Sequence, residues 1–72
     1  MSAFNVISLN KKDSIIASRI YKRLRDKGKL TGYFDILISA QAINRDLTLV
    51  TKDTDFLKVA GEFNELKVAL IT

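Results

Sequence analysis

Leu47-Thr-Leu-Val-Thr-Lys-Asp-Thr-Asp-Phe56 is the stretch that decides the fold, because it reads as a short apolar strand that runs directly into two carboxylates, Asp53 and Asp55. A strand with continuous apolar character is typical of a parallel sheet covered on both faces. In open parallel sheets, ligands bind beyond the carboxyl ends of the strands. The two aspartates therefore fall where the sequence predicts a binding site.

A mostly apolar helix precedes this strand and carries a third carboxylate. It covers Tyr33 to Ala42, with Asp35 in its first turn, and the connection Asn44-Arg45-Asp46 is short. A short connection forces the strand to run back along the helix. A helix of about eleven residues spans roughly 16 Å, and a strand of about five spans roughly 17 Å. We therefore expect Asp35 to converge with Asp53 and Asp55.

Three converging carboxylates in a chain without histidine or cysteine predict a site for a hard divalent cation. We expect weak binding of Mg²⁺ or Mn²⁺ by Asp35, Asp53 and Asp55, with Thr51 in support. Each residue also has a structural explanation, since Asp35 suits a helix N-terminus, the other two acids suit a helix cap, and Thr51 suits a turn. Convergence favours the metal site, because close carboxylates repel one another unless a cation neutralises them.

The whole chain of 72 residues is predicted to form one α/β domain with about three helices and a parallel sheet of about three strands. The remaining predicted elements are two strands, Phe4–Leu9 and Leu66–Ile71, and two helices. One helix is capped by Asn10, has Asp13 at its positive end and is ended by Gly28. The other runs from Asp55 to Val59 or Ala60, is capped by Asp53 or Thr54, and stops at Gly61.

The first long helix should bury an apolar stripe at helical spacing. The stripe consists of Ile16, Ala17, Ile20, Tyr21 and Leu24. The two tyrosines and four phenylalanines are expected in the core rather than as platforms for bases. The helix that begins at Tyr33 is apolar on most sides, and so short a chain has little protein to cover it. A homodimer or higher oligomer is therefore expected.

The net charge is +4, and six basic residues fall within eleven positions. These candidates for RNA binding are Arg19, Lys22, Arg23, Arg25, Lys27 and Lys29. The alternative is the solvated face of an amphipathic helix. The chain has no cysteine, its first residues lack the features of a signal peptide, and no apolar run is long enough for a membrane span. We therefore expect a cytoplasmic protein without membrane contact.

Three blocks of residues 13–72 resemble the C-terminal half of a PIN domain, the fold of VapC-type toxin ribonucleases. The blocks are Ile16-Ala-Ser-Arg-Ile-Tyr-Lys-Arg-Leu-Arg-Asp-Lys-Gly28, Phe34-Asp-Ile-Leu-Ile-Ser-Ala-Gln-Ala42 and Leu47-Thr-Leu-Val-Thr-Lys-Asp-Thr-Asp-Phe56. The last block is similar to the family's strand that ends in Thr-x-Asn/Asp followed by an Asp-Phe pair. The three blocks in this order are more specific than any one alone.

The resemblance implies a metal-dependent endoribonuclease, in which four carboxylates hold Mg²⁺ or Mn²⁺ at the carboxyl edge of a parallel sheet. Asp35 matches the third of these acids, Asp53 matches the fourth, Asp55 lies beside them, and Thr51 matches a hydroxyl residue near the metal. The family's first strand, which carries an aspartate, and the following helix, which carries a glutamate, have no counterpart here. The resemblance therefore implies a truncated fold without its central strand.

Three functions follow as hypotheses. The first is a PIN-type ribonuclease that is inactive alone and needs a complementing chain or a second copy. The second is a non-catalytic interaction module that binds an antitoxin or a homologue. The third is a small basic RNA-binding domain that uses the basic residues of the first helix.

Overall fold

The computed structural model describes residues 10–71, so the predicted strand Phe4–Leu9 lies outside the described residues. The α/β class is confirmed, with three helices and a parallel two-stranded sheet. The elements in chain order are α1 (Lys11–Asp26), α2 (Tyr33–Asn44), β1 (Thr48–Thr51), α3 (Asp55–Glu62) and β2 (Lys67–Leu70).

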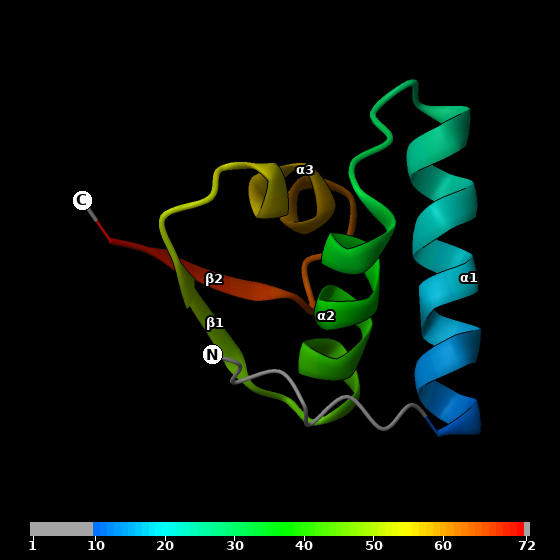
Figure 1. Ribbon diagram of the computed structural model, residues 1–72, viewed down its shortest axis with the longest axis horizontal. Coiled ribbons are helices and arrows are strands. Elements are labelled where there is room, and N and C mark those ends of the chain that lie inside the picture. Colours follow the sequence, from blue (N-terminus) through cyan, green and yellow to red (C-terminus); the bar gives the residue numbers. More distant parts are fainter. Residues whose placement is uncertain (1–9, 72) are drawn as a thin grey trace.

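The sheet and helices form layers (Figure 1). The two strands pair in parallel, with Thr48 opposite Lys67 and Thr51 opposite Leu70, and α3 connects them. Helix α2 lies between the sheet and α1, while α3 packs against α1, α2 and β2. Within residues 10–71, none of the helices has both the length and the apolar character that a membrane crossing demands.

The core lies where the three helices meet the inner face of the sheet. It contains eight buried apolar residues, which are Ala17, Ile20, Leu24, Ile36, Ala40, Ala42, Val59 and Leu66. The predicted stripe on α1 is confirmed for its aliphatic members, because Ile20 and Leu24 are fully buried and Ile16 packs against the core. Burial of side chains of this size stabilises a domain by about 1.5–3 kcal/mol each.

Both ends of α1 form as its sequence predicts. The Asn10 side chain accepts a hydrogen bond from the Asp13 amide at 2.8 Å, and the Asp13 carboxylate accepts one from the Asn10 amide at 3.2 Å, which completes a capping box. Gly28 has a φ of 68°. The Lys29 amide donates to the Leu24 carbonyl at 2.8 Å, so the helix ends in a Schellman motif that requires this left-handed residue.

An ion pair between the buried Asp13 and the partly exposed Arg45 ties the start of α1 to the end of α2, and the sequence did not reveal it. Asp13 is 0% exposed. Arg45 donates to both carboxylate oxygens of Asp13 at 3.1 Å, and the Asn44 side-chain amide donates to one of them at 2.7 Å. Burial raises the pKa of Asp13, but the hydrogen bonds from Asn44, Asn10 and Arg45, together with the Arg45 charge, outweigh it and hold the pKa below its usual 3.8.

The expected end of α3 is wrong. The helix continues through Gly61 to Glu62, and Gly61 does not have a positive φ. The last turn of α3 persists because the Glu62 carboxylate accepts hydrogen bonds from Lys29 at 3.0 Å and from Arg23 at 3.5 Å. These bonds anchor the end of α3 to α1 and to the turn that follows α1. A glycine commonly ends a helix where it adopts a left-handed conformation. Gly61 does not adopt one, so the helix continues past it.

Two expectations about burial are also wrong. Tyr21, Tyr33 and Phe34 are 39%, 63% and 49% exposed, because Tyr21 lies at the edge of the buried face of α1 and the other two lie in the first turn of α2. In contrast, Phe56 is buried as expected. The middle of α2 is covered within the chain, since Ile36 and Ala40 are fully buried under α1 and the sheet.

The ion pair of Asp13 predicts a loss of stability in acid. A carboxyl whose pKa is lowered by folding contributes its stabilisation above the unfolded pKa and loses it as pH falls through the folded pKa. We therefore expect the free energy of unfolding to fall as pH drops below about 4, and Asp13→Asn to cost about 2 kcal/mol at pH 7. Urea denaturation of both proteins from pH 7 to pH 2 measures this.

The matched control is Asp46→Asn, which removes an exposed carboxylate that pairs with Lys67 at 2.8 Å. Asparagine also tolerates the φ of 54° at this position. The control should unfold close to the wild type at pH 7. An Asp13→Asn protein as stable as this control would show that the buried carboxylate and its partners are not a major source of stability.

Candidate metal centre

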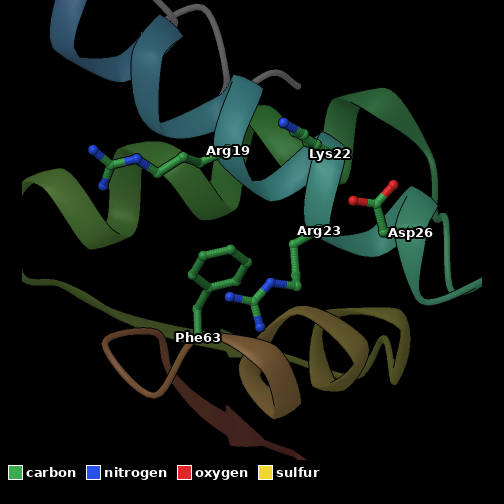
Figure 2. A pocket seen from close by; sticks show the side chains of 5 residues that line it. All are labelled: Arg19, Lys22, Arg23, Asp26 and Phe63. Atoms are coloured by element: carbon green, nitrogen blue, oxygen red, sulfur yellow. The ribbon is translucent and has the colours of Figure 1, made fainter.

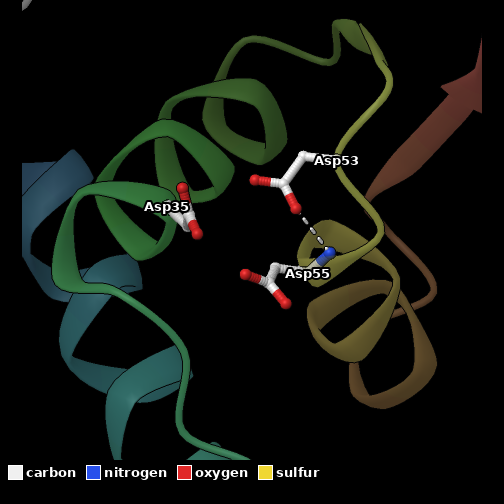
Figure 3. A group of neighbouring side chains, drawn as sticks. All are labelled: Asp35, Asp53 and Asp55. Atoms are coloured by element: carbon white, nitrogen blue, oxygen red, sulfur yellow. Dashed lines mark hydrogen bonds between the residues drawn. The ribbon is translucent and has the colours of Figure 1, made fainter.

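Three carboxylates meet at the carboxyl end of β1 (Figure 3). Asp35, Asp53 and Asp55 each offer one oxygen, and these oxygens all lie within 4.8 Å of one another. Asp35 and Asp55 are half-buried, and Asp53 is exposed. The structure thus brings together the three acids that the sequence singled out.

Asp35 is positioned by the first turn of α2. It is the third residue of the helix, after Gly32, which caps the helix without a side chain. The Thr31 hydroxyl donates to Asp35 Oδ2 at 3.2 Å, which fixes the carboxylate at the helix start. The partial positive charge of the helix N-terminus favours an anion there.

The other two acids are positioned by the turn from β1 into α3. The Asp53 amide donates to Thr51 Oγ1 at 3.0 Å, and the Asp55 amide donates to Asp53 Oδ1 at 2.9 Å. Asp53 therefore satisfies one of the amides at the start of α3, as its structural explanation predicted, while Thr54 occupies the cap position without a side-chain bond. Thr51 supports the site by holding the loop, and its hydroxyl contacts the backbone rather than a carboxylate.

Two further side chains contact the cluster, and a third lies one helical turn from Asp35. Thr31 holds Asp35. Lys58 Nζ lies 3.5 Å from Asp55 Oδ1 and offsets part of its charge. The Ser39 hydroxyl is fully buried and has no hydrogen-bond partner among the described residues. Helical spacing could have identified Lys58, three residues after Asp55, and Ser39, four residues after Asp35.

The six basic candidates divide into two groups. Lys29 and Arg23 bind Glu62, and Arg25 pairs with Asp26 at 3.6 Å and lies over the Tyr21 ring, 5.9 Å from its centre. The hydrogen bond from Lys29 lowers the pKa of Glu62 below its usual 4.5, and the charges of Lys29 and Lys27 add to this. These basic side chains therefore form contacts within the fold.

The second group consists of Arg19 and Lys22, which line a pocket of about 250 Å³ on α1 together with Arg23 (Figure 2). Arg19 and Lys22 have no hydrogen-bond or ion-pair partner within residues 10–71. Phe63 projects toward α1 from the segment after α3, and the Arg23 guanidinium lies 5.7 Å from the centre of the Phe63 ring. Asp26 is the acidic residue of this pocket.

A sequence model of the PIN domain matches residues 1–62, which is most of the chain. The chain belongs to the PIN domain family. Its three helices and two-stranded parallel sheet are consistent with a truncated PIN-like fold. No curated protein and no solved structure matches the chain.

The acid cluster of this PIN domain predicts binding of divalent cations. We expect Mn²⁺ to raise the urea midpoint of the wild type more than Mg²⁺ does, because carboxylate sites follow the usual order of affinities. Asp35→Asn should lose most of the shift, and Asp46→Asn, which lies outside the cluster, should keep it. Denaturation with and without metal measures this, and equal shifts for the wild type and Asp35→Asn would remove Asp35 from the site.

Proposed function

We propose that this chain is the C-terminal half of a toxin-type, VapC-like PIN domain and contributes to a divalent-metal-dependent endoribonuclease. The observation that carries the proposal is the convergence of the three carboxylates within 4.8 Å at the carboxyl end of β1. Membership of the PIN domain family supports a nuclease-type fold.

The residues present fit a hard cation such as Mg²⁺ or Mn²⁺. All three candidate ligands supply carboxylate oxygens, which these ions prefer. The buried Ser39 hydroxyl lies one helical turn from Asp35 and could hydrogen-bond a water there. A bound cation lowers the pKa of a coordinated water and neutralises charge on a phosphate.

The proposed roles of the chain's own residues follow from their positions. Asp35 and Asp53 would be catalytic carboxylates, and both would hold the metal together with Asp55. The Thr51 hydroxyl would keep Asp53 in place by accepting a hydrogen bond from the Asp53 backbone amide, and Thr31 would orient Asp35. Lys58 could contact a substrate phosphate, because its ammonium lies at the rim of the cluster.

A complementing chain or a second copy is also part of the proposal. Three carboxylates make a weaker cage than the four that the family resemblance implies. The described part of the sheet exposes Val50 at 63% and Leu70 at 41%, and Ile71, which directly follows β2, is 49% exposed. Exposed apolar surface of this kind marks interaction sites. The partner could instead be an antitoxin or a homologue bound by a non-catalytic module.

We expect the isolated chain to cleave RNA very slowly or not at all in Mn²⁺, and to sediment as a dimer or larger assembly at micromolar concentration. Any cleavage should vanish in EDTA and fall by about 100-fold or more in Asp53→Asn, since groups that only support metal ligands already cost 10–100-fold. A quenched fluorescent RNA and sedimentation equilibrium measure both properties.

Asp46→Asn is the control for activity, because it removes a carboxylate outside the cluster. Strong metal-dependent cleavage that Asp53→Asn leaves intact would contradict the proposed site. A monomer whose unfolding does not depend on concentration would contradict the proposed assembly.

A second candidate function is RNA binding by α1, favoured by the pocket that contains Arg19 and Lys22. Replacing both by glutamine should weaken binding of single-stranded RNA and reduce the slope of log K against log salt by about 1.4, at about 0.7 for each phosphate contact. Replacing Lys11 and Lys12 removes the same charge at the start of the helix. Equal slopes for the two double variants would show that the pocket makes no specific phosphate contacts.

A further inference from the structure

The two exposed tyrosines of the chain line one pocket. Tyr21 on α1 and Tyr33 in the first turn of α2, with Ala17 and Ser18, line an open pocket of about 210 Å³. Tyr33 is 63% exposed and Tyr21 is 39% exposed, whereas Ala17 is buried. Scattered surface aromatics are ordinary. Core packing does not explain why both exposed tyrosines line the same pocket.

The chemistry of this pocket suits a nucleobase. The tyrosine rings offer flat aromatic surfaces, and the Ser18 hydroxyl can donate or accept a hydrogen bond at a base edge. The Arg25 guanidinium lies 5.9 Å from the centre of the Tyr21 ring and adds a positive charge near the pocket. Aromatic stacking combined with cations is the usual means of binding single-stranded nucleic acid. The net charge of +4 agrees with a polyanionic ligand.

The pocket also lies close to the acid cluster. Tyr33 and Asp35 are two residues apart in α2, so their side chains leave the helix about 200° apart. Tyr33 faces the residues of α1, and Asp35 faces Asp53 and Asp55. The two sites are therefore separated by about one helix diameter, 10–12 Å. The first turn of α2 between them is exposed.

We propose that the pocket of Tyr21 and Tyr33 is a base-stacking subsite for single-stranded RNA, which holds one base while a neighbouring phosphodiester lies at the acid cluster. This assignment rests on the proposed function for the identity of the reacting site. It adds a specificity for unpaired bases, because a base already stacked in a duplex cannot enter the pocket.

Intrinsic fluorescence tests the subsite directly. The chain contains two tyrosines and no tryptophan, and both tyrosines line the pocket. Titration with a short single-stranded oligoadenylate in EDTA, corrected for its absorbance, should quench the tyrosine emission. An abasic oligonucleotide of the same length should bind more weakly and leave the emission unchanged. Single-stranded DNA should also quench it, since stacking does not read the sugar, and duplex RNA should not.

Substitutions complete the test. Tyr33→Ala should weaken oligoadenylate binding by about 5- to 150-fold, the range for loss of one stacked base. Tyr33→Phe should retain the affinity, and Leu47→Ala, an exposed apolar control, should bind as the wild type does. The assignment would be overturned by binding without quenching, by equal affinity for the abasic strand or the duplex, or by wild-type affinity in Tyr33→Ala.

The design separates this assignment from the proposed function. Tyr33→Ala should keep the stabilisation by Mn²⁺, and Asp35→Asn should keep the quenching in EDTA. If Mn²⁺ binding fails while quenching persists, the nuclease site is refuted and the stacking subsite stands. If quenching fails while Mn²⁺ binding persists, the subsite is refuted and the metal centre stands.

Discussion

The arrangement of the helices depends on the buried carboxylate of Asp13. It accepts hydrogen bonds from Asn10 within its own capping box, and from Asn44 and Arg45 at the end of α2. An ion without partners at a fully buried position costs several kcal/mol, so the start of α1 can be buried only where α2 ends. One side chain thus caps α1, contacts the end of α2 and sets how the two helices pack. The apolar contacts of Ile20 and Leu24 add most of the energy, but they are less directional.

This constraint reaches the candidate metal centre through α2. The helix has 12 residues, so its ends are separated by about 18 Å. One end is fixed by Asp13, and the other carries Asp35 to the acid cluster. Ile36 and Ala40 lock the helix between α1 and the sheet. The three carboxylates are therefore held close together by the rigid body of the fold, as a binding site requires. Their mutual repulsion is offset in part by Lys58 and by the helix N-terminus before Asp35.

Features governed by neighbouring residues were predictable from the sequence. The capping box at Asn10, the left-handed Gly28 and the approach of Asp35 to Asp53 all follow from short-range geometry. Features governed by distant partners were not. Asp13 and Arg45 are 32 positions apart, and Lys29 and Glu62 are 33 apart, so nothing local indicated either pair or the extension of α3 past Gly61. The exposure of Tyr33 was missed because hydrophobicity alone does not distinguish a core aromatic residue from an exposed one.

On the proposed function, a partner strand that covers the sheet would also complete the acid site. In the part of the chain that the structure describes, β1 pairs with β2 alone, and Val50 and Ile71 remain exposed. A parallel sheet of two strands is marginal in water, because parallel sheets are stable when both faces are covered. A strand added parallel to β1 would end at the edge that carries Asp53, since the carboxyl ends of parallel strands meet there. Any acid that follows such a strand would then join the existing carboxylates. On the proposed function, the exposed sheet surface therefore lies beside the acid cluster, and a strand that bound at this surface would also complete the metal site.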